Sequence, residues 1–241
     1  GTITTERPNQ MWGTDATSTV TVEDGAVTVF VGVDHCTLEG IGIHAAKRAT
    51  RFEALEPIRQ GVRQQFGAVS AGSATDLQVR HDHGSQYMSD DFQAELRFLG
   101  ITSSPAFVRA PEGNGVAERF IRTLKEQLLW VRTFQTVEEL RLALHDWLRL
   151  YNEQWLVERH GFRSPAQVRR DRRLSDADAL DDLSHRQRSA LAREHVEDLE
   201  PRRVGETAEP AGVQLRLFPG EIHRSSTIDD KGTGFNSACA R

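Results

Sequence analysis

Three acidic residues of this chain have the types and the spacing that suit metal-dependent phosphoryl transfer. They are Asp15, Asp82 and Glu118, and 35 residues separate the last two. Their settings are Trp12-Gly-Thr-Asp15-Ala-Thr, Arg80-His-Asp82-His-Gly-Ser-Gln-Tyr and Asn114-Gly-Val-Ala-Glu118-Arg. Three carboxylates that converge in space can hold two divalent metal ions at a phosphodiester. Because oxygen ligands favour hard cations, we expect Mg²⁺ or Mn²⁺, with two ions in each active site.

Neighbouring polar residues have more than one interpretation. Asp34 ends a predicted strand, where it is either a fourth acidic ligand or a residue that caps a turn. His81 and His83 flank Asp82, and neighbours on a strand point to opposite faces. We therefore expect these histidines to orient groups or contact phosphate rather than bind metal directly.

Five short strands are expected to position the two aspartates. Alternating and β-branched residues predict strands over 11–22, 26–33, 40–46, 77–81 and 101–104. Asp24-Gly25 between the first two strands is a hairpin signal. Asp15 falls within the first strand, and Asp82 directly follows the fourth.

Helices follow and intersperse these strands. Apolar residues at helical spacing predict helices over 51–66, 89–99, 116–131 and 136–151, and Ser164-Pro165 suits the start of another. Ser89 and Thr136 are expected N-caps. Glu118 lies on the helix that follows the loop 106–115. This order predicts a mixed α/β domain with helices packed on a central sheet.

Composition separates the chain into three parts. We expect a lead-in over residues 1–6, a catalytic core over 7–170, and a C-terminal extension over 171–241 that is partly helical and partly disordered. No apolar run approaches the roughly 20 residues that span a bilayer, so no membrane partner is expected. The cysteines, Cys36 and Cys239, lie far apart and give no disulfide framework. We expect a cytoplasmic protein.

The net charge does not by itself indicate a nucleic-acid binder. It is −5 over the 241 residues, with a composition of 38% hydrophobic residues that is ordinary for a globular protein. Part of that negative charge belongs to the carboxylates that we expect to bind metal. Bound cations would make their surroundings far less negative.

Residues 7–170 resemble the catalytic domain of bacterial insertion-sequence transposases related to retroviral integrases. These are DDE-type recombinases with a ribonuclease-H-like fold, and the likeness is strongest to the insertion-sequence-three group. The resemblance rests on six ordered segments: Pro8-Asn-Gln-Met-Trp-Gly-Thr-Asp15, His81-Asp82-His-Gly-Ser-Gln-Tyr87, Asn114-Gly-Val-Ala-Glu118-Arg-Phe, Thr123-Leu-Lys125-Glu, Tyr151-Asn-Glu-Gln-Trp and His160-Gly-Phe-Arg-Ser-Pro165.

The resemblance implies a fold, an activity and partners. It implies a ribonuclease-H-like mixed five-stranded sheet with Asp15, Asp82 and Glu118 as metal ligands. The implied reaction is nicking of DNA at transposon ends, followed by joining of the 3′-hydroxyl to target DNA. Relatives work as homo-oligomers on DNA, so self-association and a nucleoid location in bacteria are expected. Relatives also carry N-terminal helix-turn-helix segments, which we expect to be separate or missing here.

The resemblance also implies contacts to DNA beside the metal site. Glu118, Arg122 and Lys125 fall at i, i+4 and i+7, on one helix face. Related integrases place cations there against DNA phosphates; the alternative is a Glu118–Arg122 salt bridge. Arg119, His83 and Asn114 are further candidates for DNA contact, although Asn114 equally suits a helix start.

Two other functions remain open from the sequence. One is a nuclease of the same fold that cuts nucleic acid without joining it. The other is a DNA-binding or assembly module whose catalysis has decayed. The complete set of three carboxylates argues against the second, and the segments around Asn114 and Tyr151 favour strand transfer over simple cleavage.

Overall fold

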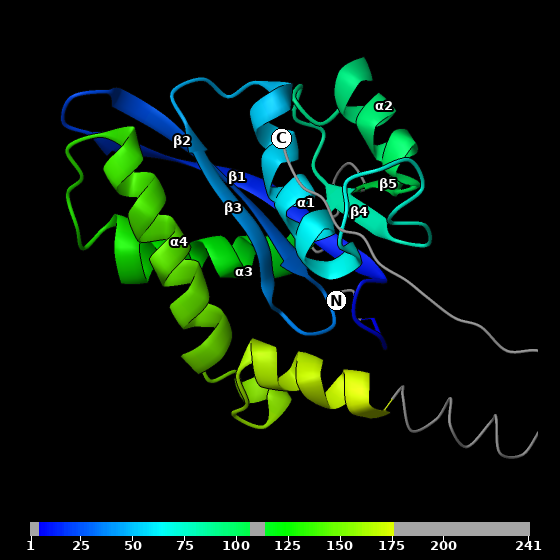
Figure 1. Ribbon diagram of the computed structural model, residues 1–241. Helices are drawn as coiled ribbons and strands as arrows, with labels where there is room; N and C mark the ends of the chain where they lie inside the picture. The colour runs from blue at the N-terminus through cyan, green and yellow to red at the C-terminus, as the bar shows by residue number, and fades with distance from the viewer. Residues whose placement is uncertain (1–4, 107–113, 176–241) are drawn as a thin grey trace, which may run out of the picture. The chain divides into compact units, whose positions relative to one another are not determined.

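A mixed five-stranded sheet forms the centre of the protein in a computed structural model, which describes residues 5–106 and 114–175. All of these residues fall within one unit, Gly1–Ala192. The strands are β1 (Met11–Thr21), β2 (Gly25–Asp34), β3 (Gly40–Ala46), β4 (Gln78–His81) and β5 (Thr102–Pro105). Their order across the sheet is β3-β2-β1-β4-β5 (Figure 1). The predicted strands and fold class are confirmed, with strand ends within one residue or so of the expected ones.

The first three strands form an antiparallel meander, and β4 and β5 extend it in parallel. β1 pairs with β2 and β2 with β3 in antiparallel register, whereas β1–β4 and β4–β5 are parallel. The turn between β1 and β2 closes at Gly25, whose φ is +73°. Glycine tolerates this left-handed backbone, which explains why Asp24-Gly25 correctly predicted the hairpin.

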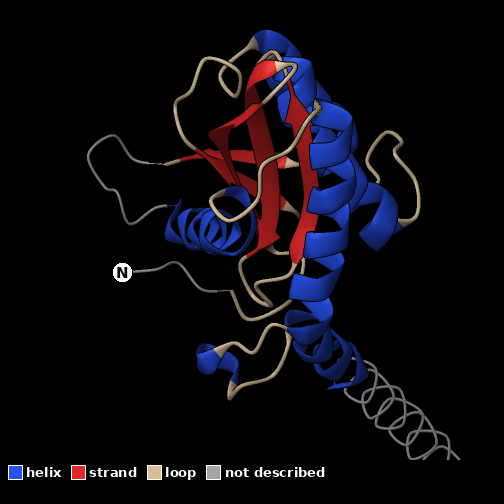
Figure 2. Cartoon of the chain, turned by 90° about the vertical axis from the view of Figure 1, so that its left-hand side faces the viewer, coloured by secondary structure: helices blue, strands red, loops and turns tan. Residues whose placement is uncertain are grey.

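Helices cover both faces of the sheet and create two apolar layers (Figure 2). On one face, α1 (Arg51–Phe66) and α2 (Asp90–Leu99) pack on residues that include Trp12, Phe30 and Val79. On the other face, α3 (Gly115–Leu124) and α4 (Val137–Gln154) pack on Val29, Val31 and Ile43. Ser89 and Thr136 cap α2 and α4 as expected, each accepting a hydrogen bond from a backbone N–H three residues on.

The helix that carries Glu118 differs from the expected continuous helix over 116–131. The α-helix ends at Leu124 and continues as a π-helical segment, η2 (Lys125–Leu129). The Trp130 N–H donates to the Lys125 carbonyl over 2.9 Å, five residues back. Leu124 and Leu129 are both buried. Residues five apart point in different directions on an α-helix, and i→i+5 hydrogen bonding brings them toward the same face.

A further helix over residues 165–175 begins at the expected Ser164-Pro165. The Ser164 Oγ accepts from the Gln167 N–H, and the Gln167 side chain accepts from the Ser164 N–H. This reciprocal pair is a capping box. The extension beyond residue 175 lies outside the described residues, as does most of the loop 106–115. No helix in the described ranges is long and apolar enough to span a membrane.

Ion pairs fix the helix over 165–175 against the sheet. Arg169 is buried, and its guanidinium contacts the carboxylates of Glu39 and Asp34, the latter over 3.5 Å. It also donates to the Asn9 side chain over 3.0 Å and to the Gln65 side chain over 3.1 Å. Nothing in the local sequence marks Arg169 as a core residue, because its partners lie more than 100 residues away.

Candidate active site

Asp15 lies in the middle of β1 and faces the helix that carries Glu118. Trp12 and Ala16 belong to the apolar layer of α1, so the intervening Asp15 points to the opposite face, where α3 packs. The carboxylate is half-buried and accepts a hydrogen bond from the Ala16 N–H over 2.8 Å.

The pKa of Asp15 shows which charges surround it. This pKa is raised to about 6: burial is the largest cause, the Asp82 and Glu118 carboxylates add to the rise, and the Ala16 N–H opposes it. Lys125 acts in the lowering direction. The charge of Asp15 on β1 is therefore affected by Asp82, which follows β4, and by Glu118 and Lys125 of the α3–η2 helix. The structure brings the three predicted carboxylates into one electrostatic neighbourhood.

Parallel pairing of β1 and β4 explains how Asp82 comes close to Asp15. The last paired residues are Gly13 and Arg80. Asp15 and Asp82 each lie two residues further along, so they occupy matching positions beyond that pair. Neighbouring strands lie about 5 Å apart. The Asp82 carboxylate is exposed and accepts a hydrogen bond from the Gly84 N–H over 2.8 Å, which orients it as the chain leaves the strand.

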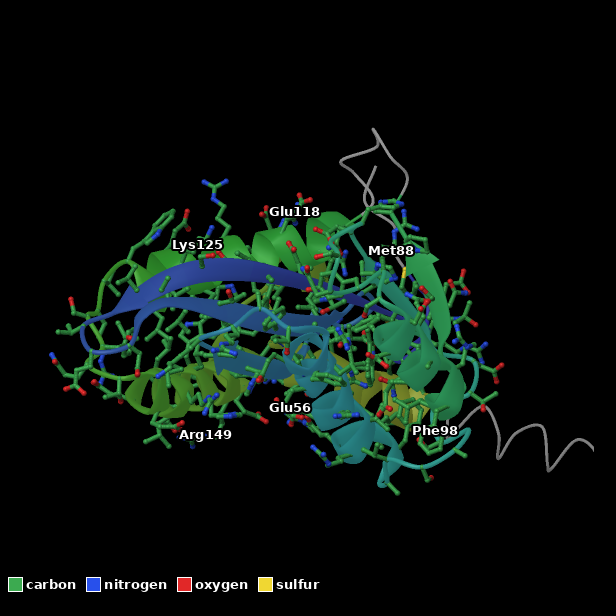
Figure 3. The ribbon with its side chains drawn as sticks, turned by 90° about the horizontal axis from the view of Figure 1, so that it is seen from above. Glu56, Met88, Phe98, Glu118, Lys125 and Arg149 are labelled. Carbon is green, nitrogen blue, oxygen red and sulfur yellow. The ribbon has the colours of Figure 1, made fainter. Side chains whose placement is uncertain are left out.

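Asn114 connects the start of α3 to β1. Its side-chain Nδ2 donates over 3.0 Å to the Thr14 carbonyl, directly before Asp15. It makes no side-chain cap of the helix, although it occupies the N-cap position. Glu118 follows one helical turn later, on the exposed side of α3 (Figure 3). Asn114 is buried, so its position suits holding α3 at a fixed place along β1.

Gly13 allows this close approach of α3 to β1. A Cβ at residue 13 would lie 2.8 Å from His35 Nε2 and 3.0 Å from Asn114 Oδ1. Such distances are too short for a real side chain. Gly13 was not among the candidate site residues, although it lies within the Trp12-to-Asp15 motif.

His81 supports the segment that carries Asp82. It is fully buried, and its ring nitrogens contact the Asp82 carbonyl at 2.6 Å and the Ser103 Oγ at 2.9 Å. The ring also stacks on Tyr87 with centroids 5.6 Å apart. Burial lowers the pKa of His81, which favours the neutral ring at pH 7. His83, by contrast, is exposed.

The cationic candidates lie on different sides of the same helix. Arg122 is exposed and pairs with Glu126 over 2.9 Å, not with Glu118. Lys125 is partly exposed and close enough to Asp15 to affect its pKa. Figure 3 shows Lys125 and Glu118 on the same helix. Arg119 instead lines a pocket together with residues of α4 and the segment after it.

Asp34 has a structural position in the turn after β2. It is fully buried, and its carboxylate accepts from the N–H groups of Cys36 over 2.9 Å and Thr37 over 2.8 Å. It also accepts from the Asn9 N–H over 2.7 Å. Of the two interpretations considered for Asp34, the structure agrees with the turn cap.

The carboxylates fit a hard-cation site by their chemistry. Within residues 5–106 and 114–175, no three His, Cys, Asp or Glu side chains stand close enough to hold a metal ion as they are. The pKa of Asp15 is nevertheless raised, mainly by burial and also by the Asp82 and Glu118 carboxylates, so the charge of Asp15 is not fully compensated. Oxygen ligands with uncompensated negative charge are what Mg²⁺ and Mn²⁺ bind.

Known proteins that resemble this chain include integrase cores and bacterial transposases. Residues 99–170 match a protein-family model described as Integrase core domain. The putative transposase InsD for insertion element IS2E of Escherichia coli (strain K12) is 25% identical over 173 residues, covering 71% of this chain and 78% of that protein. Transposase InsD for insertion element IS2A/D/F/H/I/K of Escherichia coli is also 25% identical over 173 residues, and this match spans 57% of its length.

Solved structures of viral integrases share the fold. A chain of the simian T-cell lymphotropic virus intasome, in complex with PP2A regulatory subunit B56 gamma, gives a TM-score of 0.55 at 21% identity over 70% of this chain and 57% of that one. The BIV integrase catalytic core domain gives 0.50 at 18% identity, covering 70% of this chain and 99% of that chain. The HTLV-2 integrase catalytic core domain in complex with magnesium, in its trimeric form, gives 0.50 at 18% identity over 68% and 97%.

The sheet order, the flanking helices and these relatives define the class of the protein. It contains a DDE transposase/integrase core with a ribonuclease-H-like fold. Two of the relatives are named as transposases for IS2 insertion elements, and together with the integrase-core match and the fold they support a DDE polynucleotidyl transferase.

Proposed function

We propose that this protein nicks DNA at the ends of a mobile element and joins the freed 3′-hydroxyl to target DNA. The observation that supports this most is the raised pKa of Asp15, to which Asp82 and Glu118 both contribute. Three carboxylates that come from distant parts of the chain and share one neighbourhood suit phosphoryl transfer between nucleic-acid strands.

Asp15, Asp82 and Glu118 would hold two Mg²⁺ or Mn²⁺ ions. Such ions activate a water or 3′-hydroxyl and stabilise the leaving 3′-oxygen, so no covalent enzyme intermediate is needed. The HTLV-2 core of similar fold was solved in complex with magnesium, which is in keeping with this assignment. The rigid β1 positions Asp15, the Gly84 N–H orients Asp82, and Asn114 fixes the helix of Glu118.

DNA would contact the exposed side of the α3–η2 helix. Lys125 and Arg122 are placed to neutralise phosphates beside the carboxylates, with exposed His83 next to Asp82 and Arg119 on the neighbouring helix face. The contacts of Asn114 in the structure suit a positioning residue that acts through β1.

Assembly and end recognition belong to the same proposal. The HTLV-2 integrase core is described in a trimeric form, which supports self-association of the present chain on paired DNA ends. We expect recognition of the element ends to come from a helix-turn-helix segment separate from residues 5–175. Action on DNA would place the protein at the bacterial nucleoid.

The decisive experiment removes one carboxylate without changing its shape. In an assay with labelled ends of the mobile element and Mg²⁺ or Mn²⁺, Asp82→Asn should abolish both nicking and joining while DNA binding persists. Asp146→Asn, an exposed aspartate on α4, is the matched control and should leave both reactions intact. Retained nicking by Asp82→Asn would refute the metal-ligand assignment.

The same assay separates transposition from simple cleavage. A labelled 3′-hydroxyl strand that becomes covalently joined to target DNA demonstrates strand transfer. Cleavage without any joined product, under conditions where the element ends are paired, would instead indicate a nuclease of this fold.

A further inference from the structure

A pocket of about 580 Å³ lies beside α3, away from the three carboxylates. Its lining comes from α3, the end of α4, the segment that follows α4, and the end of β2 with the segment after it, and does not include Asp15, Asp82 or Glu118. The volume falls within the range typical of sites for small molecules, about 300–1,000 Å³. The residues with polar or aromatic side chains that matter most are Arg119, Thr123, Tyr151, Trp155, Glu158 and Arg159.

The pocket offers an aromatic surface held in place from behind. Tyr151 and Trp155 stack with ring centroids 6.0 Å apart and an interplanar angle of 23°. Tyr151 is 7% exposed, whereas Trp155 is 38% exposed. Asn152 exchanges two hydrogen bonds with the Gly40 backbone, which fixes the last turn of α4. Trp155 therefore presents a large apolar ring on a rigid support.

Arg119 and Arg159 line the same pocket, and their positive charges repel each other. Arg159 Nη2 donates to the carbonyls of His35 over 2.9 Å and Cys36 over 3.3 Å, which hold its guanidinium in place. Burial lowers the pKa of Arg159, and the nearby charge of Arg119 lowers it further. An arginine stays charged at pH 7 nonetheless. Glu158 offsets one of the two charges, so the lining carries a net charge of about +1 and favours an anion.

A ligand that carries both a planar ring and a phosphate would match the aromatic surface and the positive charge of the pocket. A nucleotide has this combination, because any base can stack on an aromatic side chain while arginine contacts its phosphate. The pocket borders α3 about one helix diameter, roughly 10 Å, from the face that carries Glu118. Along a stacked strand with a rise of about 3.4 Å, that distance corresponds to about three nucleotides.

We propose that this pocket binds an unpaired nucleotide of the DNA substrate, with its base on Trp155 and its phosphate on Arg119 and Arg159. This inference rests on the proposed function, since it takes the substrate to be DNA and the reacting phosphate to lie near Glu118. It adds a binding site for single-stranded DNA beside the reaction centre.

Binding of two DNAs to the full-length chain in EDTA tests the proposal. One is a duplex with a short single-stranded tail, and the other is the same duplex with blunt ends. Trp155→Ala should weaken binding of the tailed duplex roughly 5- to 150-fold and leave the blunt duplex nearly unchanged, since stacking of a single base has that magnitude. Trp155→Phe should retain most of the affinity. A 2-aminopurine in the tail should lose fluorescence on binding to the wild type but not to Trp155→Ala.

Charge variants provide independent evidence if Trp155→Ala folds poorly. Arg119→Gln should weaken binding of the tailed duplex and reduce the slope of log affinity against log salt by about 1. Glu158→Gln should strengthen it. The matched controls are Trp130→Ala and Arg149→Gln, which alter exposed residues of the same types outside the pocket lining and should have no effect.

The outcomes distinguish this inference from the proposed function. If Trp155→Ala and Arg119→Gln bind the tailed duplex as the wild type does, while Asp82-dependent nicking persists, the pocket proposal is refuted and the proposed function stands. If tail binding depends on Trp155 but no nicking occurs, the proposed function fails and the pocket proposal stands. If the chain binds neither duplex, both fail.

Discussion

At the scale of single residues, Asp15 is unusual because burial and like charges both disfavour its ionised form. A carboxyl whose pKa is higher in the folded than in the unfolded state destabilises the fold as it ionises. Here the pKa rises from 3.8 to about 6. The folded state therefore binds the proton more tightly, and stability should fall as pH rises from about 4 through 6.

The upward shift of the Asp15 pKa gives a prediction for Asp15→Asn in metal-free buffer. The variant should unfold at higher denaturant concentration than the wild type at pH 7.5, by on the order of 1–3 kcal/mol in the free energy of unfolding. At pH 4 the difference should be small, since the wild-type carboxyl is then largely protonated. Urea denaturation at both pH values measures this difference in stability between the variant and the wild type. A stability difference independent of pH would show that Asp15 is not held in a charge-rich, buried site.

The sequence predicted the three carboxylates but not the residues that contact them in the fold. Motif settings single out Asp15, Asp82 and Glu118 because their neighbours are distinctive, and their role as metal ligands stays a prediction. Asn114 left two roles open, and its hydrogen bond to the Thr14 carbonyl crosses 100 residues of chain. No local pattern predicts such a contact. The requirement for Gly13 likewise depends on His35 and Asn114, which approach it only in the folded chain.

At the scale of elements, the α3–η2 helix carries both Glu118 and the cations proposed to contact DNA. Its hydrophobic spacing predicted a helix correctly, but not the change to π-helix at Lys125. That change depends on which residues the sheet buries, and burial is a property of the tertiary fold. The antiparallel hairpin was predictable because the Asp24-Gly25 pair suits its turn, where Gly25 takes a left-handed backbone conformation.

The cations of this helix give a prediction about salt dependence. Arg122→Gln combined with Lys125→Gln should weaken DNA binding and reduce the slope of log affinity against log salt by about 2, or about 1 for each lost phosphate contact. Fluorescence anisotropy across a salt series measures this slope.

Glu126→Gln is the informative control for that experiment, since Glu126 is the partner of Arg122 in the structure. If Arg122 contacts phosphate, loss of Glu126 should leave DNA binding equal or stronger. If Arg122 serves only its helix salt bridge, Arg122→Gln and Glu126→Gln should have equal, small effects on stability, with an unchanged salt slope.

At the scale of the whole molecule, divalent cations should stabilise the fold. The carboxylates come from β1, the end of β4 and α3, so a shared ion would hold three separate elements together. At a cation concentration 100 times the dissociation constant, the gain is about 2.7 kcal/mol.

Thermal unfolding with and without Mn²⁺ tests this prediction. The wild type should melt at a higher temperature with Mn²⁺, and Asp15→Asn and Asp82→Asn should lose most of the shift. The effect should weaken below about pH 6, because protonation of Asp15 competes with metal binding. An equal shift in the wild type and both variants would mean that the cation binds elsewhere.

The overall architecture could be predicted from the sequence because strand and helix signals follow in a regular order. The ion pairs of Arg169 with Asp34 and Glu39 could not be predicted in this way. Arg169 lies 130 residues from Glu39, and its charge would ordinarily indicate an exposed side chain. Only the folded chain surrounds it with Asp34, Glu39 and Asn9.

The chain around the α3–η2 helix is tethered to β1 at Thr14 and to Val22, the residue directly after β1. At one end Asn114 bonds to Thr14, and beyond the other end the Val22 N–H donates to the Phe134 carbonyl over 3.0 Å. Between these anchors β1 extends about 26 Å, and α3 with η2 rises about 22 Å before a short turn covers the remainder. The strand and the helix therefore cover a similar length between the two tethers. A residue gained or lost between Asn114 and Glu118 would turn Glu118 by about 100° around the helix axis, away from the face that lies toward Asp15.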